Sequence, residues 1–363
     1  MPRGKHLLDA FLMKPVQIGR IAKRKPLVTA VIGTPEAGAS GIFAILDVLS
    51  SVGRDWQILH GEAATDPFFL PRLLTLEGKP FTGPNGLVIE PHGSFSDHPE
   101  PDIVIIPELQ LDPSVPLPEY YASIAYWLKA VHTKGAIIAS VCSGSLLLGQ
   151  TGLLDGEDAT SHWGYCDAMT RSFPKIRVRK ERILVPAGIG HRLITAGGAT
   201  SWYDLLLYLI GRFAGPEEAR RVAKVFLLQS HGQGQLPFAG LTARRQHNDK
   251  IVKAAQLWIA DNYMAANPVA AMASACSLTE RSFHTRFKRA TGMSPMDYVQ
   301  TIRVEEAKQL LETSEMPLEE IADEIGYAEP ASFRRLFRRL VGVSPSAYRR
   351  QHLPVSLSIR TAN

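Results

Sequence analysis

The last hundred residues contain one helical unit twice, and this repeat constrains the fold more than any other feature of the sequence. The first copy begins at Pro268 and the second at Pro317, 49 residues later. From the second turn onward the offset is 50 residues, with Phe283, Phe287, Gly292, Pro295 and Tyr298 returning as Phe333, Phe337, Gly342, Pro345 and Tyr348. The spacing therefore predicts an all-α domain over residues 248–352, built from two similar units.

Each copy has the pattern of a short helix, a tight turn and a second helix, which is typical of a helix-turn-helix. In the first copy, Thr279 is expected to cap the second helix and Gly292 to end it. Phe283 and Phe287 are one helical turn apart and form the apolar stripe of that helix. We assign these phenylalanines to the core, so the outward residues are the ones available to a partner.

The outward side chains of both second helices are basic or small and polar. Residues 333–340 contain four arginines and no acidic residue, whereas a solvated charged face, the alternative interpretation, usually mixes the two signs. We therefore predict contact with double-stranded DNA, with base contacts near the start of each helix and phosphate contacts further along. The base-contacting candidates are Ser282, His284, Thr285, Ser332 and Arg335; the phosphate candidates are Arg286, Arg289, Arg338 and Arg339; Arg281, Lys288 and Arg334 complete the predicted surface.

Residues 248–352 resemble the AraC/XylS family of bacterial transcription regulators. The resemblance rests on Gly326-Tyr327, Ser332-Phe333, Phe337-Arg338-Arg339 and Gly342-Val-Ser-Pro345, in addition to the repeat itself. It implies two helix-turn-helix units joined by a long helix, here at about 295–312. It also implies that one chain places both recognition helices in successive major grooves, ~34 Å apart. RNA polymerase and a second copy of the chain are expected partners, in the bacterial cytoplasm.

The first part of the chain alternates short apolar runs with helical stretches, as α/β folds do. Core strands are predicted at 27–33, 102–107 and 136–141. We place the α/β domain at residues 26–229 and, because the next residues are rich in Gly, Gln and Pro, a linker at 230–247. A basic, disordered tail is expected at 1–25 and a second tail at 353–363.

Composition narrows the class of protein. A chain of 363 residues exceeds the size at which a single core stops growing, about 250–300 residues, so two domains are expected. No apolar run approaches the ~20 residues of a membrane span. The three cysteines have neither metal-ligand nor disulfide spacing, which favours a reducing compartment and predicts neither a metal site nor a cofactor. The net charge of +5 is a weak signal by itself.

Cys142 lies where a buried strand is expected to turn sharply into a helix. A nucleophile at such a turn is held at the edge of the sheet, and the helix N-terminus favours the thiolate. His162, twenty residues further on, is a candidate base. A lone cysteine is more often a buried apolar residue, however, and a lone histidine is more often structural.

The surrounding residues resemble the PfpI/ThiJ-like, class I glutamine-amidotransferase-like superfamily, and its members fused to AraC-type domains in particular. The matching segments are Val141-Cys-Ser-Gly144, Leu146-Leu-Leu-Gly149, Gly152-Leu-Leu-Asp-Gly156 and Ala159-Thr-Ser-His-Trp163. The resemblance spans about residues 27–228 and implies a flavodoxin-like α/β sandwich, with Cys142 as the elbow cysteine and His162 beside it.

Two departures from that family argue against catalysis. Enzymatic relatives carry Gly-Gly after the strand that matches 102–107, but here Pro107 is followed by Glu108 and Leu109, and each missing oxyanion donor costs about 10²–10³ in rate. They also carry an acid after the first strand, where the alignment of Glu36 stays open. We therefore expect no catalytic residues and a pocket for a small amino-acid-like or amine-like effector, lined by Glu36, Glu108, Cys142, His162, Trp163, Ser201 and Asp204.

The sequence thus predicts a sequence-specific transcription regulator, most naturally an activator, controlled through its first domain. Two alternatives stay open at this point. The first domain could be an active cysteine-dependent hydrolase or hydratase that uses Cys142 and His162. Cys142 could instead be a thiol redox sensor, which requires an exposed thiolate of low pKa.

Overall fold

A computed structural model describes residues 25–240 and 247–352 of the chain. The chain divides into two compact units, Met1–Gln235 and Leu236–Asn363, which are described separately below. Apart from Lys25, the predicted tails at 1–25 and 353–363 lie outside the described residues. Within the described ranges, no helix is both long enough and apolar enough to cross a membrane.

The first unit is built on a seven-stranded sheet. Its strands run in the order β10 (Leu184–Ala187), β11 (Leu193–Ala196), β7 (Ile137–Val141), β6 (Ile103–Ile106), β1 (Leu27–Ile32), β2 (Phe69–Thr75) and β5 (Gly93–Ser94). Only β10 pairs antiparallel with its neighbour in this sheet. The central strands are fully buried, as expected for parallel strands covered on both faces.

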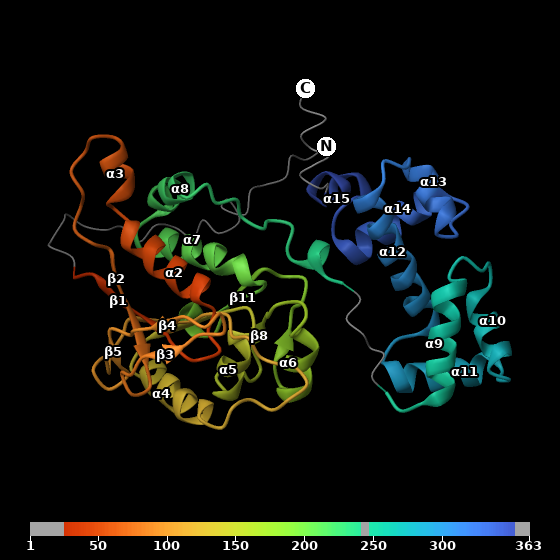
Figure 1. The fold of residues 1–363 in the computed structure, drawn as a ribbon, viewed down its shortest axis with the longest axis horizontal. Coiled ribbons are helices and arrows are strands. Elements are labelled where there is room, and N and C mark those ends of the chain that lie inside the picture. The colour runs from red at the N-terminus through yellow and green to blue at the C-terminus, as the bar shows by residue number, and fades with distance from the viewer. Residues whose placement is uncertain (1–24, 241–246, 353–363) are drawn as a thin grey trace. The chain divides into compact units, whose positions relative to one another are not determined.

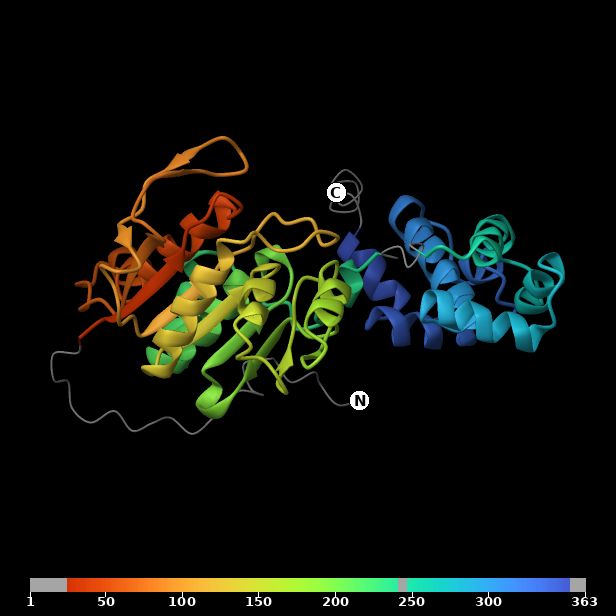
Figure 2. The same cartoon turned by 90° about the horizontal axis from the view of Figure 1, so that it is seen from below.

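Helices cover both faces of this sheet (Figures 1 and 2). Helices α2 (Ala39–Ser51) and α7 (Trp202–Phe213) pack together on one face, and α4 (Tyr121–Thr133) and α5 (Gly144–Gln150) pack together on the other. This three-layer arrangement confirms the predicted flavodoxin-like fold. The remaining elements of the unit are α3 (Asp55–Leu59), α6 (Cys166–Ser172), α8 (Pro216–Val225), β3 (Phe81–Thr82), β4 (Val88–Ile89), β8 (Asp158–Ala159) and β9 (Arg177–Val178), with short 3₁₀ turns at Ile189–His191 and Ala199–Ser201.

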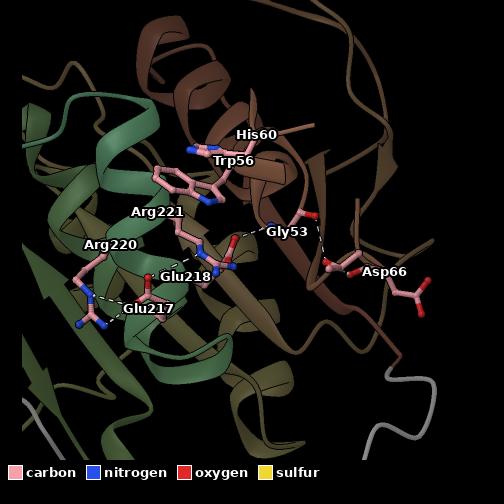
Figure 3. Close-up of polar contacts among 9 residues, drawn as sticks. Gly53, Trp56, His60, Asp66, Glu217, Glu218, Arg220 and Arg221 are labelled. Carbon is pink, nitrogen blue, oxygen red and sulfur yellow. Dashed lines mark hydrogen bonds and ion pairs between the residues drawn. The ribbon is translucent and has the colours of Figure 1, made fainter. Parts of the chain in front are cut away.

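The loop that follows α2 is fixed by a buried carboxylate of α8 (Figure 3). Glu218 accepts a hydrogen bond from the Gly53 backbone N–H at 2.8 Å, and Arg221 lies 3.4 Å from its other oxygen. Lys224 of the same helix lies over the Trp56 ring of α3 at 5.5 Å. These contacts hold α3 against α8, although the two helices are about 160 residues apart in the sequence.

The second unit is wholly helical. It begins with a 3₁₀ turn, η3 (Leu236–Phe238), and continues through α9 (Lys250–Asn262), α10 (Pro268–Ala275), α11 (Glu280–Thr291), α12 (Pro295–Thr313), α13 (Leu318–Glu324), α14 (Pro330–Val341) and α15 (Pro345–His352). The predicted long helix at 295–312 is α12. The sequence prediction of an α/β domain followed by an all-α domain is therefore confirmed.

The two copies of the repeat each have a core of their own. Phe283 and Phe287 lie in the first cluster, and Phe333 and Phe337 lie in the second. All four side chains are completely buried, in agreement with their assignment to the core. The helix ends also follow the sequence prediction. Thr279 accepts a hydrogen bond from the N–H of Ser282 at 3.3 Å, while Gly292 and Gly342 end their helices with φ of 74° and 85°.

The segment predicted as a linker is divided between the two units. Ser230–Gln235 belongs to the first unit, and Leu236 begins the second. In the second unit, the buried Lys308 donates a hydrogen bond to the carbonyl of Ala239, and the rings of Phe238 and His352 lie 5.4 Å apart. The described part of this segment therefore makes specific contacts in each unit.

Candidate DNA-binding surface and effector site

The predicted DNA-contacting residues lie on α11 and α14, the second helices of the two helix-turn-helix units. Ten of the twelve are exposed, and the other two, Arg286 and Ser332, are half-buried. The buried phenylalanines occupy the opposite face of each helix, so the apolar and basic sides are separated as the repeat predicts. Both helices thus present a basic face free of core packing.

Several of these arginines already have partners within the protein. Arg286 donates to Asp249 at 2.8 Å, and the same carboxylate caps α9 by accepting from the N–H groups of Ile251 and Val252. The hydrogen bond from Arg286 lowers the pKa of the Asp249 carboxyl. Arg334 pairs with Glu319 of α13. Arg286 therefore anchors α11 to α9, a structural role that the sequence pattern did not reveal.

Other basic residues of the two helices are better placed for a partner. Arg339 donates to Gln300 of α12 at 2.9 Å. Arg335 donates to its neighbour Ser332 on the same helix at 2.9 Å. Among the residues that the structure describes, no ion pair holds Arg281, Lys288, Arg289 or Arg338. These exposed cations are available to neutralise phosphates.

Arg303 connects the two helix-turn-helix units and was not predicted as a functional residue. It lies on α12 and is 8% exposed. Its guanidinium donates to the carbonyls of Tyr263 at 2.7 Å and Ala265 at 2.9 Å, which follow α9. It also donates to the carbonyl of Gly326 at 3.1 Å, in the turn of the second helix-turn-helix. The same group lies 5.1 Å from the Tyr327 ring. A buried arginine inside an amphipathic pattern has no periodic signature, which is why sequence reasoning missed it.

In the first unit, Cys142 occupies the strained turn between β7 and α5. Its backbone φ is 56°, a value that residues other than glycine rarely adopt, and its side chain is buried. The next residue, Ser143, bonds through its hydroxyl to both the N–H and the carbonyl of Leu109. Gly144 then passes so close to the carbonyl of Pro107 that a Cβ would collide with it. The elbow is therefore locked against the loop that follows β6.

This loop also borders the place where ligands bind in many α/β sheets. Strand order reverses between β1 and β6, and ligands commonly bind in the crevice at such a switch point. Here the Gly38 N–H donates to the Glu108 carbonyl at 3.1 Å, and the Gln110 N–H donates to the Glu36 carbonyl at 2.7 Å. The Leu109 N–H is bonded to Ser143 at 2.9 Å. The Leu109 N–H, one of the two donors at the position of the Gly-Gly of enzymatic relatives, is thus already occupied.

The acidic side chain that lies near the cysteine is Glu108. Its carboxyl group lies against Gly38 and Gly41 at the start of α2, where a Cβ on either glycine would collide with it. Burial raises the pKa of Glu108. Glu36, the acid of the first loop, is instead held by the hydroxyls of Tyr120 and Tyr121. The two acids therefore have different surroundings.

The thiol of Cys142 has the opposite character from an activated nucleophile. Burial raises its pKa to about 11, and the nearby Glu108 carboxylate acts in the same direction. Burial also lowers the pKa of His162, and the Nδ1 atom of this ring accepts from the Gly164 N–H at 3.0 Å. Within the described part of the chain, no hydrogen bond joins His162 to Cys142. The pair does not form the nucleophile–base arrangement that covalent catalysis requires.

The predicted pocket residues fall into separate groups. The ring of Trp163 lies 4.8 Å from that of His162, and the ring of Tyr165, which was not among the predicted residues, lies 6.0 Å from it; all three are half-buried. Ser201 is buried and donates to the Gly198 carbonyl at 2.6 Å. Asp204 is buried and bonds to His231, 2.7 Å from its Nδ1 atom. Ser201 and Asp204 are therefore engaged in internal contacts rather than open to a ligand.

Comparison with known proteins supports the fold class assigned to each of the two units. A model described as the DJ-1/PfpI family matches residues 70–211, and one described as a helix-turn-helix domain matches residues 272–351. The first unit thus contains a DJ-1/PfpI-type domain and the second an AraC-type helix-turn-helix domain, and the relatives that match both are transcription regulators. The chain is 26% identical over 283 residues to the HTH-type transcriptional regulator CdhR of Pseudomonas aeruginosa, covering 76% of this chain and 80% of the relative. It is 29% identical over 226 residues to GlxA of Rhizobium meliloti, covering 62% of this chain and 68% of the relative.

A similarity to an enzyme is confined to part of the regulator. Isonitrile hydratase of Pseudomonas putida is 33% identical over 144 residues, which cover 39% of this chain and 59% of the enzyme. The similarity therefore covers less than half of this chain. Whether the chain keeps any catalytic chemistry depends on the surroundings of Cys142.

Proposed function

We propose that this DNA-binding regulator is an activator that is controlled by a small molecule bound in its first unit and acts as a homodimer with RNA polymerase as its partner. The observation that carries the proposal is the elbow, which keeps the shape of a catalytic turn while its neighbouring backbone donors and its thiol are unsuited to catalysis. Such a unit is free to bind a ligand without turning it over. An effector exerts control only if it binds two states of the protein with different affinities.

The aromatic residues beside the elbow support an amine-like or amino-acid-like effector. His162, Trp163 and Tyr165 offer half-buried ring faces on one loop, and ring faces attract ammonium groups. Cys142 and Glu108 would form the floor of the site, with Glu36 at its rim. Ser201 and Asp204 would act indirectly, by holding the surrounding backbone.

In the DNA-binding unit, we propose base contacts by Ser282, His284, Thr285, Ser332 and Arg335. Phosphate contacts are assigned to the unpaired cations of α11 and α14, and Arg339 and Arg334 would join them by exchanging their present partners for phosphate. The same applies to Arg286, at the cost of its bond to Asp249. Base contacts determine sequence specificity, whereas phosphate contacts contribute affinity that decreases as the salt concentration rises.

Footprinting on the neighbouring promoter tests the DNA contacts. The double variant His284→Ala and Arg335→Ala is expected to lose the specific footprint, because both recognition helices lose a base-reading side chain. Arg171→Ala, which removes an exposed arginine of α6 in the first unit, is the matched control and should leave the footprint intact. Protection of the same site by the double variant would show that these helices do not read the sequence.

A cysteine-dependent hydratase remains the second candidate, because the chain is 33% identical over 144 residues to isonitrile hydratase of Pseudomonas putida. Cys142→Ser separates the two. A sensor keeps its effector response and its promoter control, whereas an enzyme loses turnover of its substrate while DNA binding survives. Measurable isonitrile hydration by the unaltered chain that disappears in Cys142→Ser would overturn the non-catalytic proposal.

A further inference from the structure

Gln235, the last residue of the first unit, is bound as if it were a ligand. Its side chain is buried, and its amide nitrogen donates to the carbonyls of Ser161 at 2.7 Å and Arg182 at 3.2 Å and lies 3.2 Å from the Thr160 hydroxyl. Its amide oxygen accepts from the Trp163 N–H at 2.9 Å. The donors and the acceptor of the carboxamide are therefore all satisfied by protein groups.

The surrounding backbone makes room for this side chain. Gly197, after β11, has no Cβ, and a Cβ there would lie 2.9 Å from the amide oxygen of Gln235. Gly234 has a φ of 73°, and a Cβ at that position would collide with the carbonyl of Glu181. The two glycines thus permit the close approach of this segment to the rest of the first unit.

The other end of the same segment is also anchored. The His231 N–H donates to Asp204 at 3.0 Å, and the ring nitrogens of His231 lie 2.7 Å from Asp204 and 2.9 Å from the Tyr203 hydroxyl. The rings of Tyr203 and His231 are stacked with centroids 4.8 Å apart. Ser230–Gln235 is therefore fastened to the first unit at both ends, through α7 and through the loop that carries His162.

We infer that Ser230–Gln235 is a latch that can be released from the first unit. Its Gln235 carboxamide acts as an internal ligand of the loop that carries His162 and transmits the state of that loop to the DNA-binding unit. Three of its four partners belong to residues 160–163, on either side of His162. A ligand that moves this loop changes the geometry of the Gln235 site, and by reciprocity release of Gln235 changes the affinity for that ligand. Undocking adds six residues of free chain, with a reach of about 20 Å at ~3.4 Å per residue.

The added reach matters because Leu236 already belongs to the second unit. In a dimer held together by its first units, an open latch lengthens the chain between each first unit and its DNA-binding unit. The range of separations open to the two DNA-binding units then widens, and the effective concentration at any one separation falls. This effect on DNA rests on the proposed function and the proposed dimer, whereas the docking of Gln235 does not.

Hydrogen exchange on the full-length chain tests the docking. Gln235→Ala removes the carboxamide, and Gln235→Met removes its hydrogen bonds while nearly preserving its volume. Both are expected to speed exchange of the Trp163 amide and of the amides of residues 231–235 by at least about tenfold, the effect of losing roughly 1.4 kcal/mol of local protection. Gln229→Ala, which removes an exposed glutamine just before the segment, is the matched control. Unchanged protection in Gln235→Met, with the fold intact by circular dichroism, overturns the latch.

A second measurement tests the consequence for DNA. Binding of the unaltered chain and of Gln235→Met is compared on operators whose half-sites are moved apart by one helical turn, about 10 base pairs. The latch predicts that the variant loses less affinity on the lengthened operator than the unaltered chain does. Faster exchange with an unchanged spacing preference would overturn the coupling to DNA. A footprint that no metabolite alters would instead count against the proposed effector control, and it would leave the docking result standing.

Discussion

Replacement of Arg303 by methionine should uncouple the two helix-turn-helix units. The side chain lies inside the second unit and ties three carbonyls from two different segments together, those of Tyr263, Ala265 and Gly326. Methionine keeps most of the aliphatic stem but supplies no donor. Three partly buried carbonyls then lose their partner at about 1 kcal/mol each, and the loss of the charge over the Tyr327 ring adds about 0.5 kcal/mol.

The free energy of unfolding of the second unit is therefore expected to fall by about 3 kcal/mol, near the lower end for broken buried networks, since removing the charge also removes its desolvation cost. If the full loss appears as disorder between the recognition helices, affinity for the complete operator falls by about 100-fold. Affinity for an operator that contains only one half of the recognition sequence should change much less. This difference separates a geometric effect from a general loss of folding.

Chemical denaturation and quantitative footprinting measure the two effects. Arg303→Lys keeps the charge but reaches fewer carbonyls, so an intermediate loss is expected. Lys253→Met, which removes an exposed cation of α9, is the control and should change stability by less than about 0.5 kcal/mol. If Arg303→Met unfolds within that margin of the unaltered chain and binds the complete operator equally well, Arg303 does not set the spacing of the two units.

Two further predictions concern the cores of the two units. Phe337→Ala removes a buried ring whose centroid lies 5.7 Å from that of Phe333 and 5.5 Å from that of Tyr348, so the free energy of unfolding should fall by about 3–5 kcal/mol in thermal unfolding. Leu257→Ala, which removes an exposed side chain, is the control and should change stability very little. A small loss for Phe337→Ala would contradict the core assignment. With a pKa of about 11, Cys142 is about one part in a thousand thiolate at pH 8. Its alkylation by iodoacetamide at that pH should therefore be at least about 100-fold slower than in the denatured chain. The rate of alkylation should rise with pH up to about pH 11. Because this pKa lies above its unfolded value, the protonated thiol favours the folded state below about pH 9, and this contribution is lost as the pH rises through about 11. Rapid alkylation at pH 8 would restore the redox-sensor alternative.

The sequence was sufficient for the repeated helices of the second unit because their ends and their apolar stripes are determined locally. Helix caps, the phenylalanine stripe and the terminating glycines all lie within one turn of the residues they affect, as at Thr279 and Gly292. In the first unit, β2 escaped prediction although it pairs directly with β1. Its sequence contains Pro71 and Arg72, which interrupt the apolar run, and its fit to the sheet depends on residues about 40 positions away.

The candidate site was less predictable because its contacts join distant segments. Gln235 bonds to residues 53 to 75 positions away, and nothing in a stretch of Gly, Gln and Pro distinguishes a docked glutamine from a free linker. The placement of Glu108 beside the elbow depends in the same way on Gly38 and Gly41, which sequence reasoning did not single out. The sequence singled out Cys142 and His162 by their residue types, but it did not predict how deeply they are buried or which groups they contact.

The strained backbone at Cys142 has a use even without catalysis. Holding a residue other than glycine at this φ costs about 1–3 kcal/mol, so compensating contacts are required. They are present. Ser143 bonds to Leu109 on one side, and the Ser161 hydroxyl donates to the Cys142 carbonyl at 3.0 Å on the other. The elbow thereby joins the loop after β6 to the loop that carries His162, and that second loop is the one that binds Gln235. A ligand that displaced the elbow would therefore act on Gln235 through a single intervening loop, so this turn can serve regulation without catalysing a reaction.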